Sequence, residues 1–352
     1  MTLPTLALGI EVTRHCNLRC PHCFTSSGAD APSGPSTQSL TRLIGELASA
    51  GVRSLAFSGG EPLIRNDLAD LFCAGKDAGI ADLGLVTNGY YATQARARTL
   101  AEAGLRTVQV SLDGVDAHDH TDVRHSGLAD YYRALRAIHL FKNLGLAVVV
   151  ATVISPRNVR RAPEMALFCE ALGVDGLRYC TFVPTGRAAS ADVVETFSVL
   201  PEDLSQFIGF VRQLNSNPDA RIPVSIDHAM GPWSSSGEFQ CESGRRVAYI
   251  TAEGNLYPCP ALIAEPFRVG NVFETSVSEL LLAPAMSAVR CIPRNEVEGP
   301  CSTCSNTACH GGCRGAAYAR TGNVRGAVAY CATHTINTQQ PPMTTARRPM
   351  RE

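Results

Sequence analysis

Three cysteines lie within eight residues near the start of the chain, directly after an apolar, β-rich segment. They are Cys16, Cys20 and Cys23, in the spacing CxxxCxxC. Thiolates at such spacing are typical ligands of zinc or of an iron–sulfur cluster. Zinc in a structural site takes four protein ligands, which His15 or His22 could complete. A [4Fe–4S] cluster held by three thiolates instead leaves one iron open to a further ligand.

A second set of seven cysteines lies in the C-terminal third of the chain. Two of them form a CxxC pair that is followed by two more at short spacing, and paired thiolates on tight turns can face one metal centre. From the spacing alone, zinc and iron–sulfur ligation are nearly equal alternatives. The seven are Cys241, Cys259, Cys301, Cys304, Cys309, Cys313 and Cys331.

The high cysteine number, 14 in 352 residues, also bears on the compartment. The chain is too long for a small disulfide scaffold and begins with no export signal, so we expect reduced thiols in the cytoplasm. Cys73, Cys169 and Cys180 are interpreted as small buried hydrophobic residues. Cys180 also ends a predicted strand, which makes it a candidate hydrogen donor.

Composition excludes two classes of partner. Lys and Arg number 31 and Asp and Glu 32, for a net charge of −1. No basic excess exists to neutralise phosphates, so we expect no nucleic-acid partner. The chain contains no apolar run of the length that a membrane-spanning helix needs, so we expect no membrane partner either.

Strand-like and helix-like segments alternate from residue 6 to 181 and must position the first cysteines. The predicted strands are Leu6–Thr13, Arg53–Ser58, Asp82–Thr87, Thr107–Leu112, Leu146–Ile154 and Gly176–Phe182. The predicted helices are Ser39–Ala50, Asp67–Ala78, Ala92–Ala103, Leu128–Lys142 and Val159–Leu172. Such α/β alternation predicts a parallel sheet covered by helices. Six units are too few for a closed eight-stranded barrel, so we expect a partial (β/α)6 barrel whose active site lies at the C-terminal strand ends.

The sequence pattern changes after this region. Pro201–Ser216 has helical periodicity, and Val247–Ile250 with Asn255–Tyr257 predicts a β-hairpin. Residues 241–331 carry too few periodic apolar residues for a large core, so metal ligation should stabilise them. The predicted divisions are a barrel core at 1–200, a linker helix region at 201–240, a cysteine-rich domain at 241–335 and a disordered tail at 336–352.

The first cysteine motif resembles that of the radical S-adenosylmethionine (SAM) superfamily, in which CxxxCxxC follows the first strand of a partial (β/α)6 barrel. Ser58–Pro62 (SGGEP) follows the second predicted strand and matches the family's GGEP motif. The resemblance implies that the three thiolates hold a [4Fe–4S] cluster and that His22 lies beside the adenine of SAM. It also implies that Gly59, Gly60 and Glu61 bind the methionine amino group of SAM.

Three further residues match this family at later strand ends. Asn88 ends the third predicted strand and Ser111 the fourth, and the resemblance places both at SAM. Arg124 stands at the spacing where family members place an arginine on the SAM carboxylate, a task suited to its bidentate fork. The acidic residues Asp113–Asp122 around it lack the pattern of a calcium loop. We interpret them as a solvated loop with helix-capping potential.

The seven C-terminal cysteines resemble a SPASM domain, the auxiliary-cluster extension of many radical SAM enzymes. The resemblance implies two further [4Fe–4S] clusters, one held by Cys241, Cys259 and Cys313. The other set is Cys301, Cys304, Cys309 and Cys331. Asp227, His228, Glu242 and Tyr249, near the domain junction, are interpreted as structural.

The resemblance implies an oxidoreductase or lyase that cleaves SAM reductively to a 5′-deoxyadenosyl radical, which takes a hydrogen atom from a substrate. The expected substrate is a ribosomally made peptide that is modified oxidatively in natural-product or cofactor biosynthesis. The alternative is a small sugar, aminocyclitol or nucleoside. A non-enzymatic iron–sulfur or zinc protein is a more remote alternative. The cluster loop starts at residue 16, so a peptide should need a separate recognition protein, and flavodoxin or ferredoxin should supply the electron.

Overall fold

One ten-stranded sheet organises the computed structural model, which describes residues 6–226, 241–305, 309 and 311–328. Its strand order is β10-β9-β8-β1-β2-β3-β4-β5-β6-β7, so the sheet curves without closing on itself. The first six strands are β1 (Ala7–Thr13), β2 (Ser54–Gly59), β3 (Asp82–Thr87), β4 (Thr107–Ser111), β5 (Ala147–Val153) and β6 (Gly176–Cys180). They pair in parallel, as the alternating pattern predicts.

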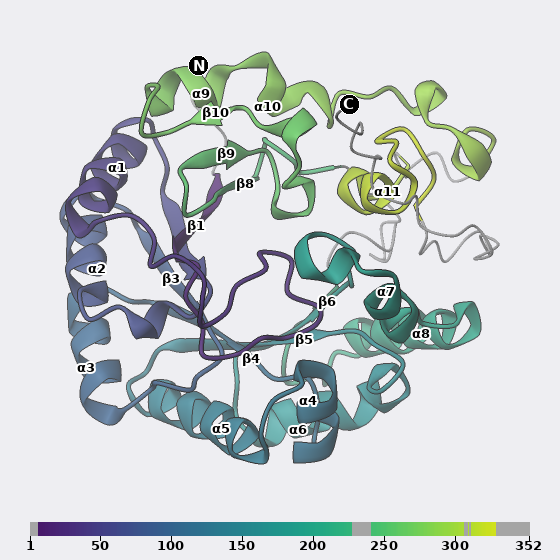
Figure 1. Ribbon diagram of the computed structural model, residues 1–352. Coiled ribbons are helices and arrows are strands. Elements are labelled where there is room, and N and C mark those ends of the chain that lie inside the picture. The colour runs from purple at the N-terminus through teal and green to yellow at the C-terminus, as the bar shows by residue number, and fades with distance from the viewer. Residues whose placement is uncertain (1–5, 227–240, 306–308, 310, 329–352) are drawn as a thin grey trace, which may run out of the picture.

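Helices cover the outer face of this sheet (Figure 1). Those of the barrel are α1 (Thr37–Ser49), α2 (Leu68–Asp77), α3 (Gln94–Ala103), α4 (Ala117–Arg124), α5 (Leu128–Asn143), α6 (Ala162–Ala171), α7 (Ala191–Phe197) and α8 (Pro201–Ser216). α1 shows why they form. The Ser36 side chain caps its first turn by accepting from the Ser39 N–H, and Leu40, Leu43 and Ile44 are buried against the strands.

Two short strands extend the parallel sheet beyond the six predicted ones. β7 (Val224–Ile226) pairs in parallel with β6, and β8 (Val247–Ile250) pairs in parallel with β1. β9 (Asn255–Tyr257) then forms the predicted hairpin with β8, and β10 (Gly270–Asn271) continues it antiparallel. The C-terminal hairpin is therefore part of the barrel sheet. Strands of three or four residues are too short for a periodic pattern, which explains why their place in the sheet was not predicted.

The C-terminal region buries more apolar surface than its pattern indicates. α9 (Val277–Leu282) and α10 (Pro284–Ala288) follow β10, and Leu256, Leu280 and Met286 belong to the main hydrophobic core. The prediction that residues 241–331 lack a core is thus wrong for their first half. The apolar residues are spread over short elements and reach the core because β8 docks on β1. α11 (Arg314–Thr321) lies farther on.

Two smaller predictions are also wrong. Residues 117–124 of the acidic run form α4, with the Asp116 side chain capping it at the Asp119 N–H, and Asp113 is fully buried. A helix of eight residues with a low apolar content shows no helical periodicity, so only its capping potential could be recognised. Cys73 is exposed on α2, whereas Cys169 is fully buried as expected.

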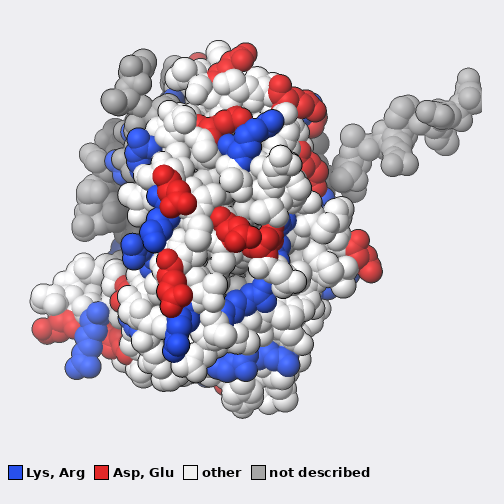
Figure 2. Space-filling model, turned by 90° about the vertical axis from the view of Figure 1, so that its left-hand side faces the viewer, with Lys and Arg blue, Asp and Glu red and all other residues white. Residues whose placement is uncertain are grey.

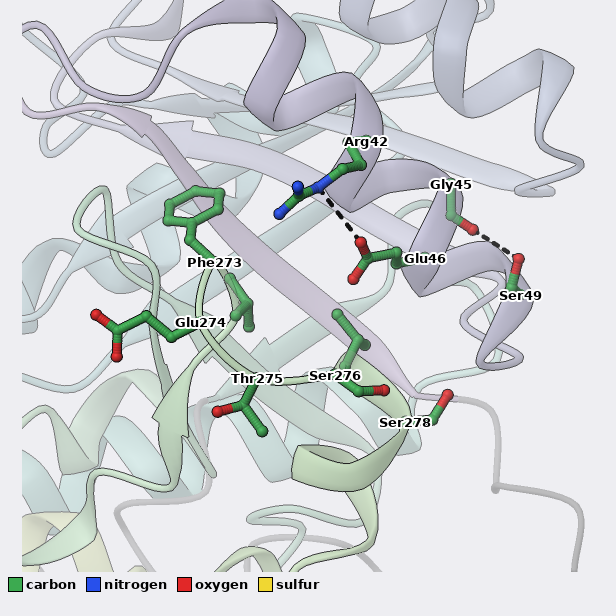
Figure 3. A pocket seen from close by; sticks show the side chains of 11 residues that line it. Arg42, Gly45, Glu46, Ser49, Phe273, Glu274, Thr275, Ser276 and Ser278 are labelled. Atoms are coloured by element: carbon green, nitrogen blue, oxygen red, sulfur yellow. Dashed lines mark hydrogen bonds and ion pairs between the residues drawn. The ribbon is translucent and has the colours of Figure 1, made fainter.

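Figure 2 shows the outer surface on the side of α1–α3. Acidic and basic side chains are interspersed on that face (Figure 2). A pocket of about 680 Å³ lies there between α1 and residues 272–278, where Arg42 and Glu46 of α1 form an ion pair (Figure 3). Within the described ranges, no helix has the length and apolar content needed to cross a membrane.

Candidate active site

A cavity of about 370 Å³ lies at the C-terminal ends of the barrel strands. Cys16, Cys20 and Cys23 all line it, on the loop after β1 that crosses the middle of the ring of strands, purple in Figure 1. Most of the residues predicted to bind SAM line the same cavity, as does the candidate hydrogen donor. They are His22, Gly59, Gly60, Asn88, Ser111, Arg124 and Cys180. The structure thus brings together residues from five different strand ends.

The cysteine loop is held in place by backbone pairing and by a distant arginine. The Cys16 N–H donates to the Gly28 carbonyl at 3.1 Å, so the loop folds back on itself. Arg187, from the segment after β6, donates from Nη1 to the Cys20 carbonyl at 2.7 Å and from Nη2 to the Ser27 carbonyl. Three loop carbonyls are therefore satisfied within the protein, which fixes the loop without a ligand.

The thiol groups of Cys16 and Cys23 have hydrogen-bond partners within the loop and on Asn88. The Leu18 N–H lies 3.4 Å from the Cys16 Sγ, and Asn88 Nδ2 lies 3.8 Å from the same sulfur. The Thr25 hydroxyl lies 3.3 Å from the Cys23 Sγ. Donors of this kind stabilise thiolates that bind iron. Without metal, burial raises the pKa of the Cys16 thiol to about 12, so cluster binding must displace a proton.

In the described part of the chain, no three Cys, His, Asp or Glu side chains converge where one metal ion would bind. His22, a possible zinc ligand, instead lies with Nδ1 3.1 Å from the Val123 carbonyl and packs on Phe197. Burial lowers the pKa of His22, which lines the cavity, to about 4, so the ring is neutral at pH 7.

Gly59, the last residue of β2, and Gly60 after it permit close backbone packing. A Cβ at Gly59, where φ is +138°, would collide with the Thr13 carbonyl, and a Cβ at Gly60 would collide with the His15 carbonyl. The Gly60 and Glu61 N–H groups donate to those same two carbonyls, at 2.7 and 2.9 Å. The glycines therefore bind β2 to the base of the cysteine loop and leave their open side to the cavity.

Glu61 is fully buried behind the cavity wall. Its carboxylate accepts from the Leu63 N–H at 3.0 Å, from the Thr87 hydroxyl at 2.7 Å and from the Asn88 N–H at 2.7 Å. Burial raises its pKa, against these hydrogen bonds. In this structure Glu61 thus holds the end of β3, and with it Asn88, in position. Its contact with the SAM amine stays a prediction.

Arg124 ends α4 and is one of two arginines on the cavity wall. Its Nε lies 2.6 Å from Oδ2 of Asp113, and its Nη1 lies 3.8 Å from the Cys20 Sγ. Asp113, which was predicted to be solvated, is fully buried and accepts from the Val153 N–H at 2.6 Å. Burial raises the pKa of Asp113, but the charge of Arg124 outweighs this and holds it below its usual value.

The sequence interpretation missed the contribution of the C-terminal hairpin to the cavity. Tyr249 of β8 lines it together with Pro260 and Ala261, just after β9. The Tyr249 ring lies over Gly9, where a Cβ would be 2.8 Å from it, and makes an edge contact with Phe24. The sequence interpretation gave Tyr249, near the domain junction, a structural role and did not include the pairing of β8 with β1. Side chains alternate between the two faces of a strand, so the pairing of β8 with β1 would have indicated that Tyr249 points into the barrel.

Three C-terminal segments that carry predicted cluster ligands meet near the start of α11. Cys313 caps this helix, its sulfur accepting from the Ala316 N–H at 3.5 Å, and its thiol interacts electrostatically with that of Cys241. Ala261, two residues after Cys259, packs against Gly315 so closely that a Cβ there would lie 2.6 Å from its side chain. The expected grouping of Cys241, Cys259 and Cys313 is thus compatible with the fold.

A buried arginine lies beside described cysteines of both sets. Arg314, 2% exposed, donates to the carbonyls of Gly326 at 3.0 Å and Val324 at 3.1 Å. It interacts electrostatically with Cys301 and Cys309 of the second set and with Cys313 and Cys241 of the first. The backbone carbonyls of Cys304 and Cys309 both accept from Arg294. Cys331 lies outside the described residues, as do Asp227 and His228.

Comparison with known proteins identifies both parts of the chain. The model described as the radical SAM superfamily matches residues 10–169, and the SPASM model, described as an iron–sulfur cluster-binding domain, matches residues 241–305. Mycofactocin maturase MftC of Mycolicibacterium smegmatis is 30% identical over 320 residues, covering 89% of this chain and 79% of that one. The AdoMet-dependent heme synthase of Methanosarcina barkeri is 27% identical over 351 residues, covering 94% and 97%.

Solved structures show the same fold. Streptococcus suis SuiB bound to precursor peptide SuiA gives a TM-score of 0.73 at 18% identity, covering 93% of this chain and 75% of that one. The enzyme anSMEcpe with bound AdoMet and Cp18Cys peptide gives 0.70 at 20%, covering 93% and 94%. The chain belongs to the radical SAM superfamily and carries a C-terminal SPASM domain, so it is an enzyme that uses iron–sulfur clusters and SAM.

Proposed function

We propose that this enzyme modifies a ribosomally made peptide oxidatively, in the biosynthesis of a natural product or cofactor. The observation that carries the proposal is the shared cavity: the cysteine loop and Tyr249, Pro260 and Ala261 of the C-terminal hairpin region line the same space. A substrate there touches both the place of radical formation and the domain that would accept an electron.

Three [4Fe–4S] clusters complete the proposal. Cys16, Cys20 and Cys23 hold the first, and the C-terminal cysteines hold two auxiliary clusters in the sets described above. When bound, the first cluster and SAM supply a 5′-deoxyadenosyl radical that takes a hydrogen atom from the substrate. Auxiliary clusters held by the C-terminal cysteines would accept the electron that the substrate radical loses, and flavodoxin or ferredoxin would deliver the electron that starts the reaction.

The chain's own residues orient the reactants and exclude water. In the proposal, the neutral His22 ring stacks on adenine, and the backbone at Gly59 and Gly60 receives the methionine end of SAM beside Glu61. Asn88, Ser111 and Arg124 complete the SAM contacts. Tyr249 with Phe24 closes the cavity on the hairpin side and limits which substrate hydrogen reaches the radical.

The comparisons support a peptide as the substrate. MftC is named as a maturase, and two structures of the same fold are described with a bound peptide. A separate recognition protein would present the peptide. The proposal also divides the chain into domains at residues 200, 240 and 335, with a tail beyond residue 335. It further includes a cytoplasmic location, where thiols stay reduced.

Dehydrogenation, epimerisation or decarboxylation of a small metabolite is the second candidate. The heme synthase relative matches nearly the whole length of both chains, which favours it. The cavity of about 370 Å³ also has the size of a small-molecule site.

Deuterium transfer distinguishes the two candidates. The reconstituted enzyme is incubated anaerobically with SAM, dithionite and an extract of deuterium-grown host cells, separated by size into a peptide and a small-molecule fraction. We expect deuterium in 5′-deoxyadenosine with the peptide fraction. Label from the small-molecule fraction alone would overturn the peptide assignment. A Cys16→Ala variant is the control for transfer that does not depend on the first cluster.

A further inference from the structure

One buried ion pair points directly at the predicted cluster. The Arg124 guanidinium uses two different nitrogens, Nε toward Asp113 at 2.6 Å and Nη1 toward the Cys20 Sγ at 3.8 Å. The Arg124 side chain is 9% exposed and that of Asp113 fully buried. The pair therefore forms a fixed dipole with its positive end at one of the three thiolates.

The neighbouring contacts keep the dipole from turning. The Asp113 carboxylate accepts from the Val153 N–H, and the Asp113 backbone N–H donates to Nδ1 of His120 at 3.2 Å. Arg124 closes α4, which the Asp116 cap and the ion pairs of Arg161 with Asp116 and Asp119 fix at its other end. Since both partners are held by separate elements, the guanidinium cannot follow Cys20 freely.

A cation and its hydrogen bond at a cluster sulfur stabilise the reduced, more negative cluster. Burial strengthens the effect because little water screens it. Asp113 works in the opposite direction from a greater distance. Its negative charge offsets part of the field of Arg124, and so the two members of one pair have opposite effects on the same cluster.

We propose that the Arg124–Asp113 pair sets the reduction potential of the N-terminal cluster, with Arg124 raising it through Cys20 and Asp113 limiting that rise. The inference rests on the proposed cluster at Cys16, Cys20 and Cys23. It gives Arg124 a positioning and tuning role in addition to the SAM contact that the family resemblance implies.

The test is the midpoint potential of the cluster that changes its EPR signal when SAM is added, measured in the full-length reconstituted protein without substrate. Arg124→Gln should shift the potential to a more negative value. Asp113→Asn, which can still accept from the Val153 N–H, should shift it to a more positive value. Arg124→Lys keeps the charge and should fall between wild type and Arg124→Gln.

The opposite signs separate tuning from structure. Loss of packing would lower cluster occupancy in both variants, but it would not move the potential in opposite directions. Arg157→Gln is the matched control, because Arg157 is exposed and lies 3.9 Å from Asp122 of α4, the helix that carries Arg124. The cluster potential of this variant should equal that of wild type. Shifts of the same sign, or none, with a loaded cluster would overturn the proposal. Absence of any SAM-responsive cluster in wild type would instead refute the proposed function.

Discussion

The two cysteine regions are positioned by different means. The N-terminal loop rests on a packed parallel sheet and is held by Arg187, the Gly59–Gly60 backbone and buried Glu61. The C-terminal region is anchored at its first half through β8 and Leu280, but beyond residue 290 its described core is small. From this difference we expect the first site to keep its shape without iron, whereas the second should depend on its clusters for structure.

Loss of the N-terminal thiols is expected to have the largest effect on activity and little effect on the fold. In a Cys16→Ala/Cys20→Ala/Cys23→Ala variant, formation of 5′-deoxyadenosine should fall to the background rate, because no iron can bind SAM. The C-terminal iron and the far-UV circular dichroism should remain. Cleavage of SAM at the wild-type rate would show that the loop is not the cluster site.

Loss of C-terminal thiols should give the reverse pattern. In Cys301→Ala/Cys304→Ala, iron should fall by about four per chain, the content of one cubane. Limited proteolysis should then cut after residue 290 while the barrel stays intact. A matched Cys73→Ala variant, whose thiol is exposed on α2, should behave as wild type. Unchanged iron, or loss of the whole fold, would contradict the comparison.

Replacing Arg314 measures how much of the stability of the C-terminal region comes from protein contacts rather than from iron. Arg314→Met should leave several buried carbonyls without a hydrogen-bond donor. The loss should destabilise this region by about 1–3 kcal/mol for each group left unpaired. Faster hydrogen exchange confined to residues 294–328 is the expected result. Equal exchange in variant and wild type would mean that the carbonyls find other donors.

Glu11 joins the two regions, since its carboxylate accepts from the Ala252 N–H at 3.2 Å. Burial raises its pKa from 4.5 to about 7, so the folded state binds an extra proton between these values. Stability should therefore fall as pH rises through this window, by at most about 3 kcal/mol. In Glu11→Gln the melting temperature should drop less between pH 5 and pH 8 than in wild type. Parallel pH profiles would show that Glu11 ionises as in the unfolded chain.

The barrel could be predicted from sequence because its strands and helices are long enough to be periodic. The six predicted strands all form, and the residues at their ends, such as Asn88 and Ser111, meet at one cavity because parallel strands share an edge. Long-range pairing was harder. Neither β8 on β1 nor the Asp113–Arg124 pair leaves a local pattern, so the place of Tyr249 at the cavity was not predicted and Asp113 was wrongly expected to be solvated.

The most direct test of the account counts iron and sulfide per chain in anaerobically reconstituted protein and follows 5′-deoxyadenosine after addition of SAM and dithionite. The account predicts about twelve irons, the content of three cubanes, together with 5′-deoxyadenosine. About four irons per chain together with SAM cleavage would show that the auxiliary clusters are absent. The proposed oxidation, which depends on them, would then lose its basis. Stoichiometric zinc with little iron and no 5′-deoxyadenosine would contradict the central claim.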